Sequence, residues 1–540
     1  MKGKGMLRTA VILAQGAFIA AMAQTSGDGF FMAKKTSDSM EPSIPRPEQE
    51  KEAQTKLADL QQKTGKRPNI IIFVIDDLGY GDIGCFGGGE AVGSPTPHID
   101  RLAREGFRLT SVYSQPTCTP SRAALMTGRL PCRSGLTRPI LPGDPIQVNP
   151  WAGEVTAAKL LSDNGYKTGL AGKWHLGEAQ GMRPHEVGYD EFFGFLGVAS
   201  DYTAYMDSRK YGPLINKPER LAAYHALGAA EYIVEGKKGG DLKNVKPLAT
   251  SEDIGNCDQE FADWSINFIK RSRAEKKSFY LVHAFCKVHK DNWPGKGYQG
   301  KSPAGTPYRD AVVEVDDMVG RILKAVEEEG ELDNTFIFIT SDNGPNEDTF
   351  PDCGFTPFRG GKGTTWEGGV RVPGIAYWHG MIKAGRVSDG LFDLTDLFNT
   401  SLGLAGISNK MPGGRYIDGV DQTAFLLADD GKTKREAVYM WSEYDFAAMR
   451  CAEFKAHIKI LTPGRPMGGV SQVTISDVGM SPWVYDLYMD PKEQFSVSVD
   501  YLEWVLPILT REGLRHQMTF LKYPPKNIGL AKPTARTTQD

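Results

Sequence analysis

Two pairs of oxygen-bearing side chains each follow an apolar run of the sequence. The pairs are Asp76-Asp77 and Asp342-Asn343. In open parallel sheets, ligands bind beyond the carboxyl ends of the strands, so we expect both pairs at one edge of a sheet. Three carboxylates and an amide form an oxygen-only site that suits Ca²⁺ or Mg²⁺. One pair alone would be explained as well by a turn or a helix cap, because Asp and Asn favour both.

A cysteine surrounded by polar residues is the second chemical feature. Cys118 is followed by Thr, Pro, Ser and Arg122, and then by an apolar, helix-like stretch that ends before Gly128. A helix N-terminus and the guanidinium of Arg122 would both stabilise anionic oxygens near residue 118. A lone cysteine is more often a buried small hydrophobic residue, and that explanation stays open at this point.

Three further residues with basic side chains lie among glycines. Lys173 and His175 stand between Gly172 and Gly177, and Lys362 has glycines at 360, 361, 363 and 368. Glycines allow the backbone to approach a ligand closely, and alternate residues of an extended segment face the same way. For each residue taken alone, a solvated surface charge is the ordinary explanation.

Two histidines compete for the role of an acid near these groups. His283 lies inside a predicted strand at 278–285, and His289 follows the end of that strand. Because catalytic groups of such sheets stand at the carboxyl ends of strands, we prefer His289 and interpret His283 as a core residue.

The elements that must position these groups can be predicted from apolar patterning. The runs 69–75 and 335–340 are rich in β-branched residues, as is typical of strands buried on both faces. Helices are expected at 97–105, 156–165 and 308–329. Alternating strands and helices predict an α/β fold with a mostly parallel central sheet flanked by helices.

The pattern changes after residue 428. Short strands are expected near 437–442, 449–454, 457–461 and 483–487, with a closing helix at 510–521. We therefore predict a smaller C-terminal α+β domain with an antiparallel sheet. The predicted division is a signal peptide at 1–23, a linker with one short helix at 24–67, a catalytic domain at 68–428, a C-terminal subdomain at 429–523 and a flexible tail at 524–540.

The first segment resembles an export signal. Lys2, Lys4 and Arg8 precede a largely apolar run that ends in Ala-Met-Ala at 21–23, the small-x-small pattern of signal-peptidase sites. The run is short for a membrane-spanning helix, so we predict a protein that is exported to the periplasm or secreted, without stable membrane insertion. An uncleaved membrane anchor is the alternative.

Composition excludes several classes of protein. The 540 residues carry a formal net charge of −3, which offers no basic surface for nucleic acid. Hydrophobic residues at 40% and charged residues at 24% exclude a disordered, fibrous or polytopic membrane protein. Seven cysteines are too few for a disulfide scaffold.

The sequence around the cysteine resembles a known family signature. Cys-Thr-Pro-Ser-Arg at 118–122, continued by Ala-Ala-Leu-Met-Thr-Gly-Arg, is similar to that of type I sulfatases, the arylsulfatase family of the alkaline phosphatase superfamily. Further motifs follow in the family's order, at 76–82, 172–177, 341–344 and 361–369, with Tyr485-Asp-Leu and Asp490-Pro-x-Glu493 near the C-terminus. His98 stands where the family more often has Asn, and the segment 283–289 matches the family more loosely.

This resemblance implies an alkaline-phosphatase-like large domain and the hydrolysis of a sulfate monoester to an alcohol and inorganic sulfate. In the family, a maturation enzyme oxidises the cysteine, here Cys118, to Cα-formylglycine. Residue 118 would act as the aldehyde hydrate, attacking sulfur with one hydroxyl and expelling sulfate with the other. The substrate would be an aryl sulfate or a sulfated saccharide.

The resemblance also implies a role for each motif residue. Ca²⁺, or else Mg²⁺, would be held by Asp76, Asp77, Asp342, Asn343 and residue 118. Arg122 and Lys173 would stabilise the alkoxide of residue 118, His175 would take a proton during sulfate release, and His289 and Lys362 would stabilise or protonate the leaving oxygen. Ser200 would add a hydrogen bond to the substrate.

Two alternatives remain on the sequence alone. A phosphonate monoester hydrolase or phosphodiesterase of the same superfamily would share the metal pairs and even the modified cysteine. A non-catalytic protein that binds sulfated glycans on a degenerate sulfatase fold is the alternative from a different class.

Overall fold

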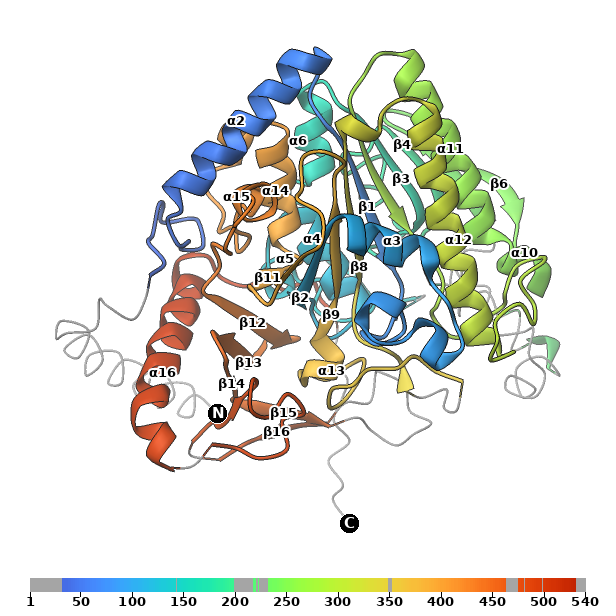
Figure 1. The fold of residues 1–540 in the computed structure, drawn as a ribbon. Coiled ribbons are helices and arrows are strands. Elements are labelled where there is room, and N and C mark those ends of the chain that lie inside the picture. Colours follow the sequence, from blue (N-terminus) through green and yellow to red (C-terminus); the bar gives the residue numbers. More distant parts are fainter. Residues whose placement is uncertain are drawn as a thin grey trace.

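The computed structural model describes residues 32–141, 143–198, 217–219, 222, 232–347, 352–462, 474–479, 481–497 and 499–530 (Figure 1). Two predictions lie outside these residues: the signal peptide at 1–23 and the substrate-binding role of Ser200. No helix in the described part of the chain combines the length and apolar character that crossing a bilayer demands.

A sheet of 11 strands forms the centre of the molecule. Its strands are β1 (Asn69–Ile75), β2 (Phe107–Tyr113), β3 (Lys167–Lys173), β4 (Glu191–Phe195), β5 (Tyr232–Lys237), β6 (Lys243–Pro247), β7 (Phe279–Ala284), β8 (Thr335–Ser341), β9 (Arg371–Tyr377), β10 (Arg386–Ser388) and β11 (Phe392–Asp393). The order is β10-β2-β9-β8-β1-β7-β3-β4-β5-β6, and β11 pairs with β2. Only β9 and β5 run against both of their neighbours, so the predicted mostly parallel sheet is confirmed.

Helices cover both faces of this sheet. They are α2 (Pro47–Thr64), α3 (Pro97–Glu105), α4 (Cys118–Thr127), α5 (Pro131–Ser134), α6 (Ala157–Asp163), α10 (Ser251–Gly255), α11 (Cys257–Ala274), α12 (Pro307–Glu328), α13 (Glu367–Val370), α14 (Asp396–Leu404) and α15 (Thr423–Leu427). Short 3-10 turns lie at Gly84–Phe86, Gly89–Val92, Leu332–Asn334 and Ser408–Lys410. The helices expected at 97–105, 156–165 and 308–329 correspond to α3, α6 and α12.

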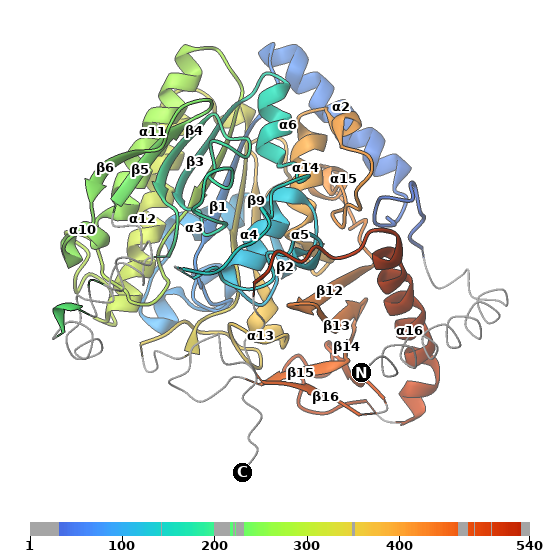
Figure 2. The ribbon, with the colours of Figure 1, turned by 180° about the vertical axis from the view of Figure 1, so that it is seen from behind.

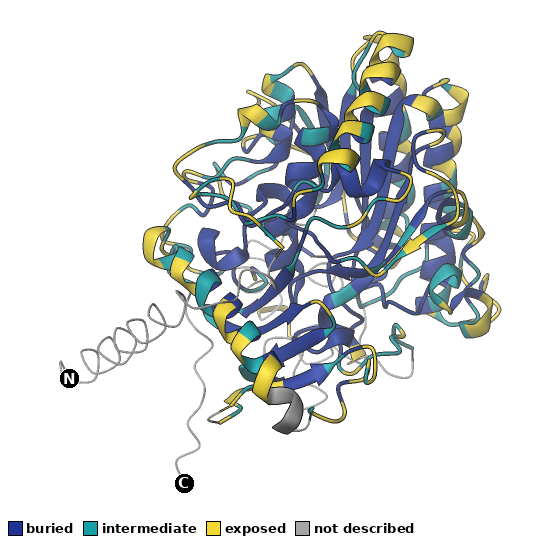
Figure 3. Ribbon diagram, turned by 60° about the vertical axis from the view of Figure 1, so that its left-hand side comes forward, coloured by how far each residue is buried: buried dark blue, intermediate teal, exposed yellow. Residues whose placement is uncertain are grey.

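Alternation along β1 explains the two layers. Successive side chains of a strand point to opposite faces, so Ile70, Ile72 and Val74 join one core cluster with residues of α4, α6, α14 and α15. The intervening side chains of β1 join a second cluster with α3, α11 and α12. Figures 1 and 2 show these helix layers on opposite sides of the sheet. The central strands are buried, the edge strand β6 is largely exposed, and many other exposed residues lie on the outer sides of the helices (Figure 3).

A second, smaller sheet is antiparallel, as predicted. It has the order β12-β13-β14-β17, and a separate two-stranded sheet pairs β15 with β16. The bounds are β12 (Ala437–Ser442), β13 (Asp445–Cys451), β14 (Phe454–His457), β15 (Lys459–Thr462), β16 (Thr474–Asp477), β17 (Trp483–Asp486) and helix α16 (Val499–Lys522). The stretch expected as one strand at 449–454 contains a turn, because Ala452 has a left-handed φ of 51° and separates β13 from β14.

The two ends of the folded chain differ from their expectations. The helix predicted within the linker is α2, which begins at a proline suited to the first helical turn and buries Ala53 and Leu60 in the main core. The start of the predicted tail also packs, since Ile528 is fully buried in the same core. These described parts of the predicted linker and tail therefore belong to the folded body.

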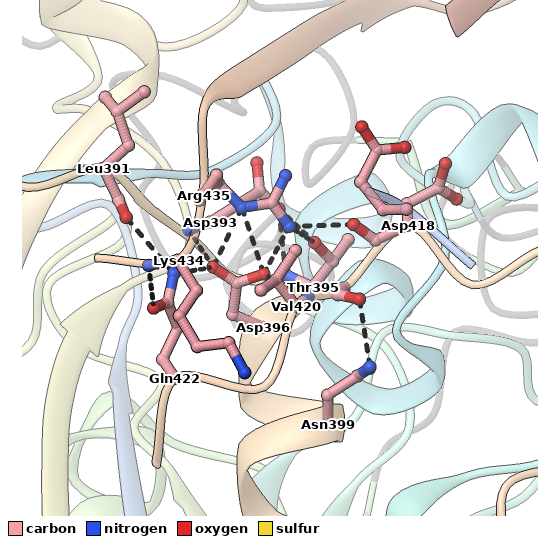
Figure 4. Close-up of polar contacts among 12 residues, drawn as sticks. Leu391, Asp393, Thr395, Asp396, Asn399, Asp418, Val420, Gln422, Lys434 and Arg435 are labelled. Carbon is pink, nitrogen blue, oxygen red and sulfur yellow. Dashed lines mark hydrogen bonds and ion pairs between the residues drawn. The ribbon is translucent and has the colours of Figure 1, made fainter. Parts of the chain in front are cut away.

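Arg435 joins the small sheet to helix α14 of the large domain. It precedes β12, and its guanidinium binds the carboxylate of Asp396 at the start of α14 (Figure 4). The same guanidinium donates to the carbonyls of Asp418 at 2.8 Å and Ala437 at 3.1 Å. The first strand of the small sheet is thus fixed by a buried ion pair to the large domain.

Candidate active site

Strand register brings the two predicted acidic pairs together. β1 and β8 are parallel neighbours, and Ile75 lies beside Ser341 at their carboxyl ends. The hydroxyl of Ser341 accepts a hydrogen bond from the Leu78 N–H at 3.0 Å and lies 2.9 Å from the Ile75 carbonyl. This serine therefore ties the two strand ends directly beneath the acidic residues. It was not predicted as a functional residue, although its place between a buried strand and an Asp-Asn pair was a usable signal.

The four oxygen-bearing side chains form one buried cluster. One oxygen each of Asp76, Asp77 and Asp342 and the sulfur of Cys118 all lie within 4.8 Å of one another. The Asn343 amide donates to Asp77 Oδ1 at 2.7 Å, and its own Oδ1 is buried without a hydrogen-bond partner. Oxygen donors at this spacing, one of them unpartnered, fit a hard divalent cation. The residues present are therefore suited to the metal that the sequence predicts.

Cys118 stands at the first position of α4, with its side chain directed at the cluster. Its Sγ lies 3.6 Å from Asp76 Oδ1 and 3.9 Å from Asp77 Oδ1. Burial raises the pKa of the thiol to about 12, although Lys173 and Lys362 act in the opposite direction. The thiol is therefore protonated near neutral pH, and an unmodified cysteine here is a weak nucleophile.

Three cations surround the three carboxylates. The closest pairs are Lys173 Nζ with Asp76 Oδ2 at 2.5 Å, Lys362 Nζ with Asp77 Oδ1 at 2.6 Å, and Arg122 Nε with Asp342 Oδ2 at 2.9 Å. Charges this deeply buried are tolerated only when each is paired. The cations predicted from the Cys118, 172–177 and 361–369 motifs thus converge on one site.

The pKa values of the paired groups follow from burial and charge. Burial acts to raise the pKa of Asp77, but Lys362 and His289 outweigh it and the pKa is lowered. The pKa of Asp342 is raised, by burial and by the neighbouring Asp76. Burial acts to lower the pKa of Lys362, but Asp77 and the other acidic groups outweigh it and the pKa is raised. Lys362 therefore carries its positive charge into the site.

The structure separates the two candidate histidines. His289 Nε2 lies 3.7 Å from Asp77 Oδ2, at the edge of the cluster. His283 lies inside β7, where its Nδ1 is 2.9 Å from Ser265 Oγ and its ring packs against Phe285. Its place is therefore in the core, as its sequence context predicted.

His175 enters the site from a turn rather than from an extended strand. β3 ends at Lys173, and His175 has a left-handed φ of 58°. Its Nε2 lies 3.0 Å from the Ile140 carbonyl, whereas its Nδ1 is buried and has no hydrogen-bond partner. Burial lowers the pKa of His175 well below its usual value. A neutral imidazole with a free nitrogen can accept a proton.

Two other groups hold this histidine, and sequence reasoning missed both. The Thr119 hydroxyl donates to the His175 carbonyl at 2.7 Å and accepts from the Ile140 N–H at 3.3 Å. Thr119 follows Cys118 directly, so residue 118 and His175 are fixed relative to each other. Ile140 contributes only backbone atoms, and no side-chain pattern could have indicated it.

Glycines at the motifs make close backbone contacts, as expected. A Cβ on Gly172, whose φ is +99°, would meet the Ala284 carbonyl oxygen at 1.9 Å. A Cβ on Gly368 would meet the Gly360 carbonyl oxygen at 2.0 Å. Both positions therefore need glycine to bring Lys173 and Lys362 to the site.

Comparison with known proteins agrees with this geometry. Residues 68–407 match the family model described as Sulfatase. N-acetylgalactosamine-6-sulfatase of Canis lupus familiaris is 33% identical over 491 residues, which cover 85% of this chain and 87% of that protein. Arylsulfatase A of Bos taurus is 33% identical over 467 residues, covering 82% of this chain and 85% of that protein.

Solved structures show the same likeness. The PsFucS1 sulfatase from Pseudoalteromonas sp. superposes with a TM-score of 0.90 at 53% identity, over 93% of this chain and 100% of that one. The Ps i-CgsB protein in complex with k-i-k-neocarrahexaose superposes with a TM-score of 0.68 at 26% identity, over 87% of this chain and 96% of that one.

Proposed function

The chain belongs to the sulfatase family and hydrolyses sulfate esters, and we propose that its substrate is a sulfated saccharide. The observation that carries the reaction is the cluster itself, in which Cys118 faces three carboxylates and three cations. Such a site neutralises an anionic ester group and places a nucleophile beside it. A non-catalytic glycan-binding protein would not need this set of groups around one side chain.

We propose that Cys118 is converted to Cα-formylglycine. The hydrated aldehyde supplies two hydroxyls on one carbon, one to attack sulfur and one through which sulfate leaves. The support is positional, because the side chain of residue 118 reaches both Asp76 and Asp77. Its place at the N-terminus of a ten-residue helix also favours negative charge on that side chain.

We propose further that Asp76, Asp77, Asp342 and Asn343 hold Ca²⁺, or else Mg²⁺, together with residue 118. A divalent cation there supplies Lewis-acid stabilisation of a sulfate oxygen. The unpartnered Oδ1 of Asn343 and the absence of nitrogen donors from these four motif residues support an oxygen-preferring ion.

The remaining residues handle charge and protons around that centre. Arg122 and Lys173 stabilise negative charge on residue 118, because both cations lie against Asp76, whose Oδ1 is 3.6 Å from Cys118 Sγ. His175 accepts a proton at its free Nδ1 when sulfate leaves. His289 and Lys362 lie beside a different carboxylate, that of Asp77, and stabilise or protonate the leaving oxygen.

Similarity to carbohydrate sulfatases supports the substrate class. The mammalian relatives include N-acetylgalactosamine-6-sulfatase, and the Ps i-CgsB structure is a complex with k-i-k-neocarrahexaose. Arylsulfatase A is a relative as well, so aryl sulfates are the matched comparison. We therefore expect higher kcat/KM on a sulfated mono- or oligosaccharide than on 4-nitrophenyl sulfate.

A panel of substrates tests both the reaction and its alternative. Purified enzyme would be assayed on saccharides sulfated at defined positions, 4-nitrophenyl sulfate, 4-nitrophenyl phenylphosphonate and bis(4-nitrophenyl) phosphate. Release of sulfate from at least one saccharide, at higher kcat/KM than any phosphorus substrate, is the expected result. Preference for the phosphonate or the phosphodiester would instead identify a phosphonate monoester hydrolase or phosphodiesterase of the same superfamily.

We also propose that residues 1–23 direct export and are removed. The basic residues at the start of this segment and the Ala-Met-Ala at its end support export. We propose in addition that a maturation enzyme converts Cys118 while the chain is being produced. The N-terminal sequence of protein recovered outside the cytoplasm is expected to begin after Ala23. Recovery of intact Met1 in all of that protein would contradict cleavage.

A further inference from the structure

A network of buried charges contacts the loop that carries Lys362. Its members are Glu367 of α13, Lys455 and His457 of β14, and Glu493 of the turn after β17, and each side chain is 0% exposed. Lys455 Nζ lies 2.9 Å from Glu367 Oε1 and 3.2 Å from Glu493 Oε1. The network thus joins the active-site loop of the large domain to the small sheet.

Burying these charged groups costs desolvation free energy that their mutual attraction need not offset. Replacing a buried ion pair by apolar side chains is often neutral or stabilising, so such a pair is weak evidence for stability. Glu493 is also held at a left-handed φ of 51°, which residues other than glycine rarely adopt. We therefore ask which residues Glu493 holds in place.

Glu493 binds both ends of the Lys362 loop. Its Oε2 accepts a hydrogen bond from the Glu367 backbone N–H at 2.7 Å. Its backbone carbonyl accepts from Arg359 Nη1 at 2.6 Å. The nine-residue segment that starts at Arg359 and ends at Glu367 therefore closes on one residue of the small domain, with Lys362 near its middle.

The rest of the loop transmits this position to Lys362. The Arg359 guanidinium carbon lies 3.7 Å from the centroid of the Trp366 ring. The ring centroids of Trp366 and His457 are 4.3 Å apart. The Gly368 N–H donates to the Arg359 carbonyl at 2.8 Å, so the two ends of the loop also bind each other. The loop therefore has little freedom to change the place of the Lys362 ammonium relative to Asp77.

The C-terminal motif supplies the other half of this contact. Asp490 accepts hydrogen bonds from the N–H groups of Gln494 and Phe495, at 2.6 Å and 2.8 Å, and so shapes the turn that presents Glu493. Tyr485 packs edge-on against Trp366, with ring centroids 5.9 Å apart. The motif Tyr485-Asp-Leu with Asp490-Pro-x-Glu493 is thereby accounted for as a clasp on the Lys362 loop.

We propose that Glu493 is a positioning residue for Lys362, through which the small domain sets the stabilisation of the leaving oxygen. The inference rests on the role proposed above for Lys362. It assigns a function in the reaction to a residue that does not touch the reacting atoms.

Substrates with different leaving groups test this inference. 4-Nitrophenyl sulfate releases an acidic phenol and needs little help, whereas phenyl sulfate releases a more basic oxygen and needs more. Glu493→Gln is expected to lower kcat on phenyl sulfate about tenfold, as is typical when a group that orients an active-site residue is removed, with a smaller loss on 4-nitrophenyl sulfate and little change in KM. Lys362→Ala is expected to show the same selectivity with a larger loss.

A double-variant cycle gives the decisive comparison. If Glu493 acts through Lys362, then Glu493→Gln causes no further selective loss in the Lys362→Ala background. Equal losses in both backgrounds, or a loss in Glu493→Gln that is the same for both substrates, would overturn the inference. Wild-type turnover in Lys362→Ala would instead refute the role proposed for Lys362, whatever Glu493 does.

A matched control separates positioning from stability. Asp418 is another buried acidic residue, bound to Arg133 at 2.7 Å and remote from the Lys362 loop in its contacts. Asp418→Asn is expected to lower the unfolding midpoint without changing the ratio of the two kcat values. If Glu493→Gln does not fold, Arg359→Ala removes the exposed end of the same clasp, and it must show the selective loss for the inference to stand.

Discussion

Two of the buried charge clusters in the described part of the chain differ in how completely their polar atoms are paired. Around Arg435 and Asp396, the guanidinium donates to Asp396 and to the carbonyls of Ala437 and Asp418, while Asp396 also accepts from the Val420 N–H (Figure 4). Around Cys118, the polar atoms Asn343 Oδ1 and His175 Nδ1 are buried without a hydrogen-bond partner.

The difference shows which cluster is built to bind something. An unpaired polar atom in a protein interior costs free energy, so the unpaired atoms near Cys118 are tolerated where a ligand completes their bonds. The Arg435 and Asp396 side chains have no unpartnered polar atom left to bind a ligand. Their contacts connect two parts of the fold. Changes at the first cluster should therefore affect turnover, and changes at the second should affect stability.

The largest effect on turnover is expected from Cys118→Ala. Removal of the proposed nucleophile should reduce activity to the background of the assay, with the unfolding midpoint little changed. Mass spectrometry of the peptide that contains residue 118 is expected to show an aldehyde in place of the thiol in active wild-type protein. The modified fraction should follow the specific activity across expression hosts. Full turnover from protein with an entirely unmodified Cys118 would contradict the mechanism.

Metal removal is expected to have the next largest effect. Exhaustive chelation should abolish sulfate release, and Ca²⁺ or Mg²⁺ should restore it, because the site offers oxygen ligands. Bound metal should also raise the unfolding free energy, by about 2.7 kcal/mol at a free concentration 100 times the dissociation constant. Metal analysis that found stoichiometric zinc and neither calcium nor magnesium would contradict the assignment of an oxygen site.

Much of the active cluster could be predicted because its signals are local. β-Branched runs followed at once by Asp76-Asp77 or by Ser341-Asp342-Asn343 place the acidic groups at strand ends without knowledge of the tertiary structure. The glycines around Lys173 and Lys362 are local signals too. β1 and β8 end immediately before Asp76 and Asp342, and β3 ends at Lys173.

The parts that could not be predicted depend on contacts between distant residues. The backbone of Ile140 holds His175, and Glu493 binds a loop more than 100 residues earlier in the sequence. The packing of α2 was missed for the same reason, because its partner α15 is remote in sequence and the helix is polar on most of its surface. A single sequence carries no pattern for pairings of this kind.

Lysine substitutions should have an intermediate effect that sharpens the comparison. Lys173→Ala and Lys362→Ala are each expected to reduce kcat by about 10²–10³, because each removes one stabiliser of developing negative charge. Circular dichroism and the unfolding midpoint, measured in Ca²⁺, should show a folded protein in both cases. Lys56→Ala, at a pair on the outer surface of α2 with Asp429, is the matched control and should retain wild-type kcat. Near wild-type turnover in either active-site variant would refute the role of that lysine.

The smallest effect on turnover is expected at the Arg435–Asp396 pair, whose own side chains have no unpartnered polar atom. Arg435→Met removes the guanidinium and leaves the carboxylate of Asp396 buried without its partner, which typically costs about 3–5 kcal/mol. The urea midpoint should fall accordingly, while kcat per folded molecule, measured well below that midpoint, should match the wild type. The double variant Arg435→Met with Asp396→Leu removes both charges and should recover much of the lost stability, because no unpaired charge remains. A strong loss of kcat in folded Arg435→Met would mean that the joint between the sheets contributes to the reaction, and that complete pairing does not distinguish a structural cluster from a functional one.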